Sequence, residues 1–484
     1  MRRRTYLAGM SASVVGTVLS GCTSGGEVEV GDDETPTGEQ STPTERTTTR
    51  RPTGEPPGET TAEDETATTT DDDPATTTED DPEQTNGLSV ETYFEDTETN
   101  PGAAVSAARS LVDRGVPYVC GPAASGVALP VFEESLVPNR VVGCTPSATA
   151  PALSTLRDDD YTFRTAPSDT LQARAMATVA AEEAGADTAA VLARDNEYGR
   201  QLATRFQRAF EAGGGSITAE VLHAQGRSSY TSPLQQALSS EPDALAVVTY
   251  PDDATRLFRD FYADFDVSLS AVVVPDALRD PELPSRVDDD MDDVMGLAPA
   301  AAGPGLDAFR RAYETAYGGS PGVFAEQAYD AVAVGILAGA AAGTDDAAAI
   351  RGQMRAVANP DGIVVTPENF AEGVAAAARG EAVDYRGASS AVNFDERGDP
   401  AIAPYDRWEF DGASIRDVET LQVAGKRPQG SGPEATDAPG SDPGRTIPIG
   451  ILLPETGTLG PVAGSMIRAA RLPPRQVEAA DIRL

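Results

Sequence analysis

Histidine and clustered cysteines are nearly missing from this chain of 484 residues. The one histidine is His223, and the three cysteines include no CxxC pair. A histidine-ligated metal cluster is therefore excluded, because such a site needs several ligands at short spacings. A Ser-His-Asp triad would have to depend on His223 alone, which stands in a segment typical of a strand edge. We interpret His223 as a partly exposed strand residue and expect no enzymatic activity, no metal and no cofactor.

Lysine is also nearly missing. Lys426 is the only one, so arginine supplies almost all of the positive charge. Acidic residues outnumber basic ones by 77 to 37, which gives a net charge of −40. Such a surface repels nucleic acid, so no polynucleotide partner is expected. The acid excess is typical of proteins from extreme halophiles, in which salt screens the self-repulsion, and we infer a haloarchaeal source.

The cysteines are few, and one of them belongs to a predicted export signal. Arg2-Arg3-Arg4 opens a twin-arginine pattern, and a short apolar stretch ends in Leu19-Ser20-Gly21-Cys22. Residues 1–22 are therefore predicted to be a lipoprotein signal with Cys22 as the lipidated residue. The alternative is an uncleaved anchor, but the apolar stretch is shorter than the roughly 20 residues that a membrane span needs. We expect a lipid-anchored protein on the outer side of the cell membrane.

The other two cysteines, Cys120 and Cys144, fall at the carboxyl ends of predicted neighbouring strands. Outside the cell they could form a disulfide. The alternative is two buried free thiols, and the sequence leaves both open.

Two segments lack the large apolar residues that a core requires. Residues 23–87 consist mainly of Thr, Asp, Glu, Pro and Gly, which predicts a disordered spacer. Residues 425–445 are rich in Gly, Pro, Ser and Asp and are predicted to be a flexible linker. The remaining 88–424 and 446–484 are long enough for two lobes with their own cores.

From residue 88 onward, segments typical of strands and helices alternate. Regular alternation predicts an α/β fold with parallel, doubly wound sheets covered by helices on both faces. Residues 392–394 and 407–410 are predicted to pair as strands around a turn at 395–399. The other predicted strands are 89–95, 117–120, 140–143, 161–165, 189–193, 217–222, 244–249 and 270–274, and the predicted helices are 103–114, 127–135, 171–184, 198–212, 231–239, 253–264, 306–317 and 324–342.

Small and hydroxyl-bearing residues follow several of these strands. In parallel sheets, ligands bind at the loops that leave the carboxyl ends of the strands. Ser125 opens a predicted helix, where free N–H groups and a hydroxyl suit a carboxylate, and Ser147 and Thr149 follow the next strand. Ordinary helix capping would use the same residue types.

Tyr198, Tyr250 and Asp276 follow strands in the second half of the chain. The tyrosines offer a hydroxyl and a ring face, and Asp276 offers a partner for an ammonium group in a desolvated cleft. The alternative for Asp276 is a solvated loop acid.

Five motifs in order give the chain a specific resemblance. It resembles the type I periplasmic binding proteins of ABC importers, in the leucine/isoleucine/valine-binding branch, over about residues 88–421 and 446–484. The motifs are Gly121-Pro122-x-x-Ser125-Gly126, Thr145-Pro146-x-Ala148-Thr149-x-Pro151, Arg164-Thr165-x-Pro167-x-Asp169, Asp195-x-x-Tyr198-Gly199 and Tyr385-x-Gly387-Ala388-Ser389.

The resemblance implies two Rossmann-like lobes, joined by three crossovers, that close on a ligand like a hinged trap. Lobe 1 would comprise about 88–167 and 300–378, and lobe 2 about 168–299 and 379–421. The implied partners are a small solute, such as a branched-chain or related amino acid, an amide or urea, and an ABC permease. A ligand-binding sensor with the same fold is the alternative.

The resemblance also implies roles for single residues. Ser125, Ser147 and Thr149 would hold the α-carboxylate of the ligand. Tyr198, Tyr250 and Asp276 would lie near its ammonium group and side chain. The loop that contains Thr456 and Gly457 would line the side-chain pocket.

The order of the segments departs from that family. Residues 446–457 are typical of a buried strand running into a glycine-containing loop, and a helical stretch follows. No such strand precedes residue 88, so residues 446–484 are interpreted as a relocated first strand–helix unit, as in a circular permutation. A swapped dimer and a rearranged or mis-assembled gene are the alternatives. Pro473-Pro474 predicts a short or kinked helix.

The charge excess gives a first prediction, about salt. We expect the melting temperature to fall steeply between molar and millimolar KCl, because less salt screens the mutual repulsion of the carboxylates. Differential scanning calorimetry at several salt concentrations measures this. An equal melting temperature in both salts would contradict the expectation.

Overall fold

The computed structural model describes residues 87–359, 361–400, 402–412, 414–424 and 445–484, and these described residues group as one compact unit. The predicted signal at 1–22, with Cys22, lies outside the described residues. So do the predicted spacer and linker, apart from Gly87 and Arg445.

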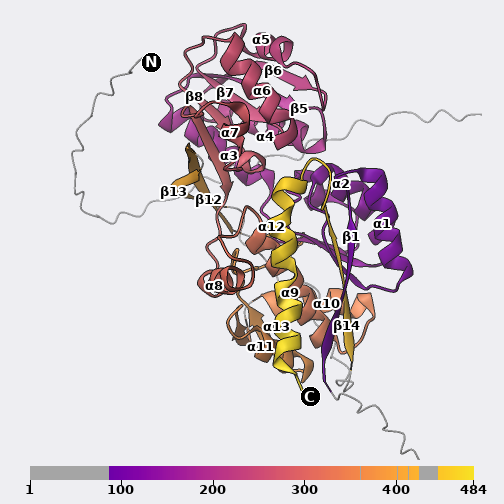
Figure 1. Ribbon diagram of the computed structural model, residues 1–484. Helices are drawn as coiled ribbons and strands as arrows, with labels where there is room; N and C mark the ends of the chain where they lie inside the picture. The colour runs from indigo at the N-terminus through magenta and orange to yellow at the C-terminus, as the bar shows by residue number, and fades with distance from the viewer. Residues whose placement is uncertain (1–86, 360, 401, 413, 425–444) are drawn as a thin grey trace, which may run out of the picture. The chain divides into compact units, whose positions relative to one another are not determined.

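Five parallel strands form the sheet of lobe 1. The strand from the C-terminal segment lies inside this sheet, with β1 on one side and β2 on the other (Figure 1). Its apolar sequence, Thr-Ile-Pro-Ile-Gly-Ile-Leu-Leu, suits a strand that is covered on both faces. The order is β1 (Ser89–Asp96), β14 (Thr446–Leu453), β2 (Tyr118–Cys120), β3 (Val142–Thr145) and β4 (Thr162–Arg164).

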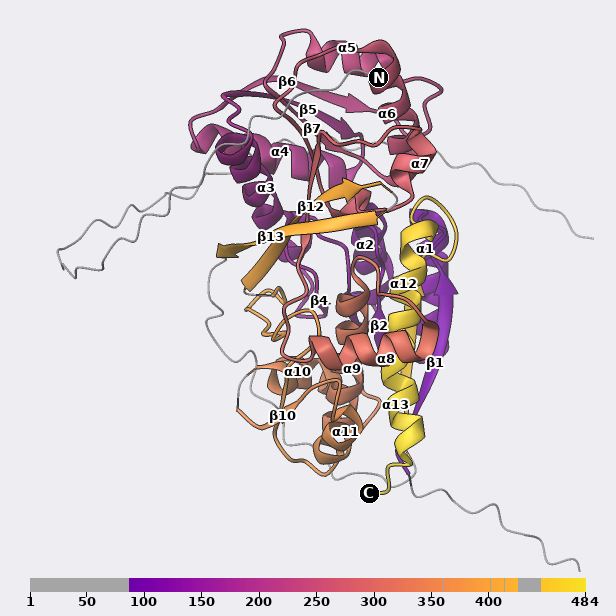
Figure 2. The ribbon, with the colours of Figure 1, turned by 60° about the vertical axis from the view of Figure 1, so that its left-hand side comes forward.

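Helices cover both faces of this sheet (Figure 2). On one face lie α1 (Pro101–Asp113) and α2 (Ser125–Val131), and on the other α9 (Ala325–Ala342), α10 (Ala347–Ala358), α12 (Gly460–Ala470) and α13 (Leu472–Ala480). Small residues let α9 approach the sheet closely, since a Cβ on Gly335 would lie 2.3 Å from the ring of Tyr118. Among the described residues no single helix meets the length and hydropathy of a membrane span, and α9 with α10 does so only as a pair bent by 114°.

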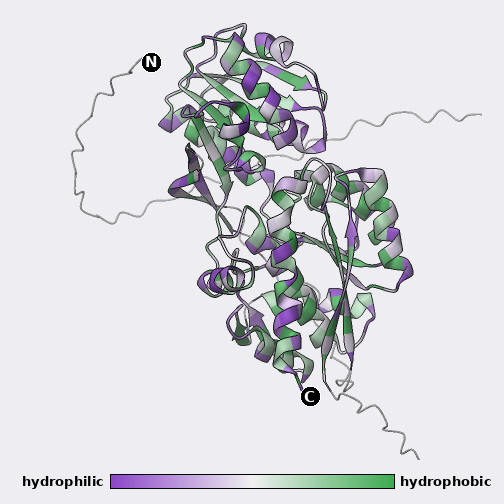
Figure 3. Ribbon diagram, viewed as in Figure 1, coloured by the Kyte–Doolittle hydropathy of each residue, from purple (hydrophilic) through white to green (hydrophobic). Residues whose placement is uncertain are grey.

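Seven strands form the sheet of lobe 2, and green, apolar residues concentrate on its inner strands (Figure 3). The order is β13 (Ser414–Ala424), β12 (Ile402–Asp411), β9 (Val294–Pro299), β8 (Ala271–Val274), β7 (Ala244–Val248), β5 (Thr188–Arg194) and β6 (Ser216–His223), of which β12 runs antiparallel to both of its neighbours. The helices α3 (Asp169–Thr178) and α4 (Glu197–Ala212) cover one face, and α5 (Thr231–Leu238), α6 (Pro251–Asp264) and α7 (Leu283–Val287) cover the other.

The prediction of a strand pair between 392–394 and 407–410 is wrong. The turn at 395–399 does form, but only one bridge, Phe394 to Pro400, closes it. Residues 407–410 pair instead with β9 and β13. Gly296 on β9 makes room there, because a Cβ on it would lie 1.9 Å from the indole of Trp408.

The boundary predicted between the lobes near residue 378 is also corrected. The small sheet of β10 (Ile363–Val365) and β11 (Val383–Tyr385) lies with α11 (Phe370–Ala378) beside α9. Farther along the chain, Asp399 forms an ion pair of 2.6 Å with Arg164 at the end of β4. Residues up to about 400 therefore pack with lobe 1, and the third crossing leads directly into β12.

The C-terminal helix is divided as the prolines predict. It breaks at Arg471 into α12 and α13, and Pro473 and Pro474 occupy the first turn of α13, where their missing N–H groups cost no helical hydrogen bond. Beyond α13 the chain end meets the start of β1, since the N–H of Leu88 donates to the carbonyl of Ile482 at 3.0 Å.

His223 differs from its predicted surroundings, whereas the two cysteines show one of the two arrangements that the sequence left open. His223 is the last residue of the edge strand β6, but the ring of Tyr230 packs against it at 5.0 Å and leaves it 1% exposed. The prediction of a partly exposed residue is therefore wrong. Cys120 and Cys144 are register partners on β2 and β3, and both are buried free thiols rather than a disulfide.

Candidate ligand-binding site

A narrow pocket of about 30 Å³ is lined from both lobes. Its walls come from loops at the carboxyl ends of β2, β3, β5, β7 and β8, as expected for parallel sheets. Five of the residues singled out in the sequence meet here: Ser125, Ser147, Tyr198, Tyr250 and Asp276.

The two loops of lobe 1 are bonded to each other beside the pocket. The hydroxyl of Ser125 accepts from the N–H of Ala150 at 3.1 Å, and the hydroxyl of Ser147 donates to the carbonyl of Ala123 at 3.1 Å. Ser125 thus keeps its own proton free to donate. Of the two hydroxyls, only that of Ser125 is therefore free to donate to a carboxylate or another acceptor, since the proton of Ser147 is already bonded.

Two tyrosines form the wall from lobe 2. The rings of Tyr198, in the first turn of α4, and Tyr250, at the start of α6, stack with centroids 5.4 Å apart and planes 9° apart. The hydroxyl of Tyr198 is buried and has no hydrogen-bond partner among the described residues. A ligand could supply that partner, since buried polar groups are normally bonded.

Asp276 places a carboxyl group at the pocket. It is 4% exposed, and one of its oxygens accepts from the side-chain amide of Gln172 on α3. Burial raises the pKa of Asp276 to about 6. Behind it, burial and then the charge of Asp276 raise the pKa of Asp169 to about 8. A cation that entered here would favour the ionised form of both carboxyl groups.

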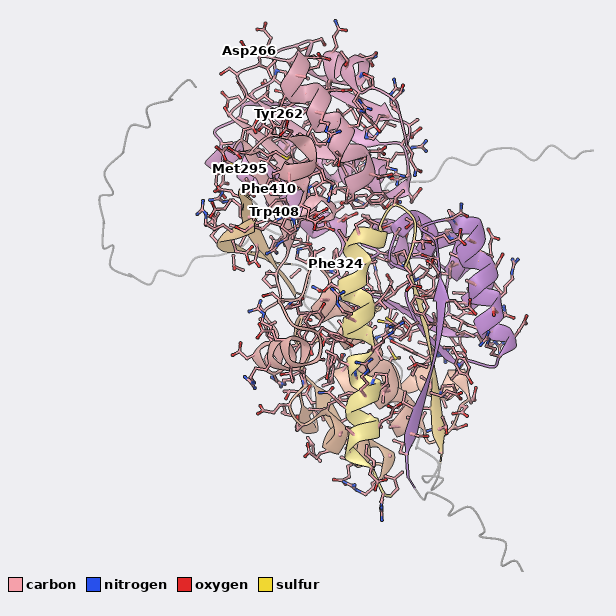
Figure 4. The ribbon with its side chains drawn as sticks, viewed as in Figure 1. Tyr262, Asp266, Met295, Phe324, Trp408 and Phe410 are labelled. Atoms are coloured by element: carbon pink, nitrogen blue, oxygen red, sulfur yellow. The ribbon has the colours of Figure 1, made fainter. Side chains whose placement is uncertain are left out.

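The rest of the wall is apolar and was not predicted. Phe324, labelled in Figure 4, stands before α9 in a left-handed conformation with φ of 61°. It faces the first turns of α12, and their apolar residues recur at a helical spacing that could have signalled a buried stripe. The apolar lining consists of Ala123, Ala124, Ala277, Val323, Phe324, Leu459, Val462 and Met466.

The fold and this pocket can be compared with known proteins. A family model described as periplasmic binding protein matches residues 83–382. The chain belongs to the periplasmic binding protein family. The match ends before residues 446–484, the segment that supplies β14 to the sheet.

Several relatives of this binding protein are known. BasB of Halobacterium salinarum, named as the substrate-binding protein of a chemotactic signal transduction system, is 28% identical over 346 residues, or 70% of this chain and 80% of BasB. Leu/Ile/Val-binding protein homolog 3 of Brucella melitensis is 37% identical over 128 residues, which cover 26% of this chain and 34% of that protein.

Solved structures confirm the predicted two-lobed type I fold. The leucine-binding protein LivK of Thermotoga maritima aligns with a TM-score of 0.57 at 23% identity, over 67% of this chain and 86% of LivK. LivJ of Streptococcus pneumoniae, solved with isoleucine, gives 0.51 at 18% identity, over 69% of this chain and 87% of LivJ.

Three predicted site residues of this binding protein lie outside the pocket lining. Thr149 is buried, and its carbonyl accepts from the N–H of Asp169 at 2.8 Å. Thr456 donates to Asp96 at the end of β1, at 2.7 Å. Gly457 has φ of 80°, and a Cβ there would lie 2.0 Å from the carbonyl of Glu98. The loop after β14 is therefore held against the loop after β1, and only its last residue, Leu459, reaches the pocket.

The motifs that begin at Arg164 and Tyr385 stabilise the fold around the pocket of this binding protein. Arg164 is 1% exposed and forms a two-pronged pair with Asp399, at 2.6 and 2.9 Å, while it also donates to the carbonyl of Ala150 at 3.1 Å. It thereby fixes the loop that bonds to Ser125. Asp330 on α9 accepts from the hydroxyl of Tyr385 at 2.6 Å and from two N–H groups of the Gly-Ala-Ser turn. Among the described residues no group of His, Cys, Asp and Glu is arranged to hold a metal.

The buried carboxyls give a prediction for pH. The pKa of Asp169 is raised from 3.8 to about 8, so the folded state binds this proton more tightly than the unfolded state. The associated stability is fully present below about pH 4 and is lost as the pH rises through about 8. We expect Asp169→Asn to flatten this loss and to raise stability at pH 8 by roughly 2 kcal/mol or more, since one pKa unit corresponds to about 1.4 kcal/mol.

Urea unfolding of the ligand-free protein between pH 4 and pH 8 measures the effect. The control is Asp113→Asn, which removes one exposed negative charge from α1. If the free energy of unfolding changed equally with pH in both variants and the wild type, the pH dependence would not come from Asp169.

Proposed function

We propose that this protein is an extracytoplasmic solute-binding lipoprotein that captures a branched-chain or related amino acid between its lobes. The observation that carries the proposal is the arrangement of one pocket. The free hydroxyl of Ser125 on lobe 1, the carboxyl group of Asp276 on lobe 2 and a set of apolar side chains line the same pocket. A zwitterion with an apolar side chain complements these three features.

The charge of the pocket separates this ligand class from its alternatives. No arginine, lysine or histidine is among the residues that line it, whereas Asp276 is. A related structure from R. palustris was solved with benzoate, but an aromatic acid without an amino group would leave Asp276 uncompensated here. Neutral amides and urea would likewise leave the carboxylate without a cation.

The proposed membrane partner is an ABC permease that accepts the captured amino acid. This role follows the family resemblance, and closure of the lobes on the ligand would present the loaded form. A sensor with the same fold is the second candidate. BasB is named as part of a chemotactic signal transduction system, and it shares 28% identity with this chain over 80% of the length of BasB. Uptake of labelled leucine by cells that lack the gene supports transport if it falls, whereas a loss of chemotaxis alone supports sensing.

We also propose that residues 446–484 are a first strand–helix unit moved to the C-terminus. Support comes from the seam between the chain end and β1. If Leu484 were joined to Leu88, the bond from the N–H of Leu88 to the carbonyl of Ile482 would become the i to i+3 bond of a β-turn. A join would therefore need no inserted residue.

The same rearrangement leaves the attachment point of the proposed lipid anchor almost unchanged. Ser89 and Thr446 are register partners at the starts of β1 and β14, and their hydroxyls lie 2.9 Å apart. A tether that leads into either strand thus arrives at one edge of lobe 1.

The ligand class gives a direct prediction. In molar KCl, leucine, isoleucine or valine should raise the melting temperature, because a ligand that binds only the folded state stabilises it, and benzoate should not. Asp276→Asn should weaken the affinity for leucine by about 10- to 100-fold, because a charge-assisted hydrogen bond typically contributes that much to binding. Titration calorimetry measures this, with exposed Asp266→Asn on the same lobe (Figure 4) as the control. Benzoate binding without an amino-acid response would contradict the proposal.

The relocation gives a second prediction. A variant with residues 446–484 placed directly before Leu88, and ending at residue 424, should melt within a few degrees of the wild type and keep its response to leucine. A variant that lacks 446–484 should show no cooperative transition, because β1 and β2 lose the strand between them. Light scattering tests the alternative, since a stable dimer of the natural chain would indicate strand exchange. An unfolded rejoined variant would overturn the interpretation.

A further inference from the structure

Behind the tyrosine wall of the pocket stands a buried arginine that does not touch the pocket itself. Arg194 is the last residue of β5 and is 4% exposed. Its guanidinium carbon lies 4.7 Å from the centroid of the Tyr250 ring. Arg194 and Tyr198 thus both pack against Tyr250, and only the two tyrosines line the pocket.

Arg194 is itself held by the helix that Tyr250 begins. Its Nη1 lies 3.2 Å from Asp252 and 3.4 Å from Asp253, both in the first turn of α6. The arginine therefore connects the end of β5 to the first turn of α6, and it also contacts the ring of Tyr250, which precedes that turn. A planar guanidinium can stack on a ring and meet carboxylates at its edge at the same time, which an ammonium group cannot.

The acid that anchors Arg194 is fixed in turn. Asp253 is 2% exposed, and one of its oxygens accepts from the hydroxyl of Tyr230 at 2.5 Å and from the N–H of Gly226 at 2.8 Å. Its other oxygen has no hydrogen bond among the described residues, so the nearby guanidinium is its charge partner. This fixed acid holds the arginine in place.

We propose that Arg194 is a positioning residue for the ligand site, which sets the tilt of Tyr250 and, through the stack, of Tyr198. The expected effect of Arg194 on ligand affinity rests on the proposed function. Its expected effect on the positions of the two tyrosine rings does not. The wall of lobe 2 is then formed before ligand arrives, which lowers the ordering cost of binding.

Arg194→Lys tests this, because it keeps a charge for the two aspartates and removes the flat group over the ring. We expect a melting temperature within a few degrees of the wild type, a Kd for leucine weakened about 10-fold, and most of that change in the dissociation rate. Arg200→Lys is the control, since Arg200 pairs with Asp195 at 2.5 Å on the same lobe and, within the part of the chain that the structure describes, stacks on no ring.

A second measurement needs no ligand. With 3-fluorotyrosine incorporated, the 19F resonances of Tyr198 and Tyr250 are assigned from Tyr198→Phe and Tyr250→Phe, and Arg194→Lys should shift both while Arg200→Lys shifts neither. If leucine fails to bind the wild type, the proposed function fails, but these shifts still decide whether Arg194 positions the rings. Unmoved resonances, or a Kd that changes only together with the melting temperature, would overturn the proposal.

Arg194→Lys can fail to fold if the ammonium group does not reach both aspartates. The triple variant Arg194→Met, Asp252→Asn, Asp253→Asn removes the buried charges together and leaves no unpaired acid. It should show the same loss of leucine affinity and the same ring shifts. A triple variant with wild-type resonances would also overturn the proposal.

Discussion

The pairing of β14 between β1 and β2 is the contact on which the rest of the structure depends. It places a strand from the C-terminal segment between the edge strand β1 and β2 of one parallel sheet, and α9 and α12 pack on that strand. Because parallel sheets are normally covered on both faces, and because both β1 and β2 pair with β14, removing β14 would disturb every layer of lobe 1. The apolar pocket wall on α12 follows from the same placement, since Leu459 and Met466 reach the pocket only with β14 in register.

Buried charge is used in two ways in this binding protein. Some buried or partly buried carboxylates accept several hydrogen bonds and hold separate segments of the fold together. Asp399 does so with Arg164, and Asp330 does so with Tyr385 and the turn that follows it. Where carboxyls lack a cation, as at Asp276 and Asp169, burial raises their pKa and leaves the site prepared for a ligand that brings positive charge. Burial raises the pKa of Asp330 to about 6 as well, so these acids differ in the number of hydrogen-bond donors around them rather than in the direction of the pKa shift.

Local sequence pattern predicted much of the site, and its failures have a common cause. Ser125, Ser147, Tyr198, Tyr250 and Asp276 were found because each follows a strand, and the ends of parallel strands meet at one edge. Thr456 and Gly457 follow a strand as well, yet they contact Asp96 and Glu98 instead of the pocket. Phe324, which follows no strand, was missed. Whether a loop residue turns toward the pocket depends on neighbouring loops that are distant in sequence.

The sequence by itself determined the α/β class, most of the strands and helices, the helix break at Pro473 and Pro474, and the family motifs, because period, proline and glycine act locally. Tertiary structure decided that Cys120 and Cys144 are free thiols, that His223 is covered by Tyr230, and that residues up to about 400 pack with lobe 1. It also placed Arg194 behind Tyr250. Each of these depends on which segments come together in space, and contacts between separate segments leave no mark in a local pattern.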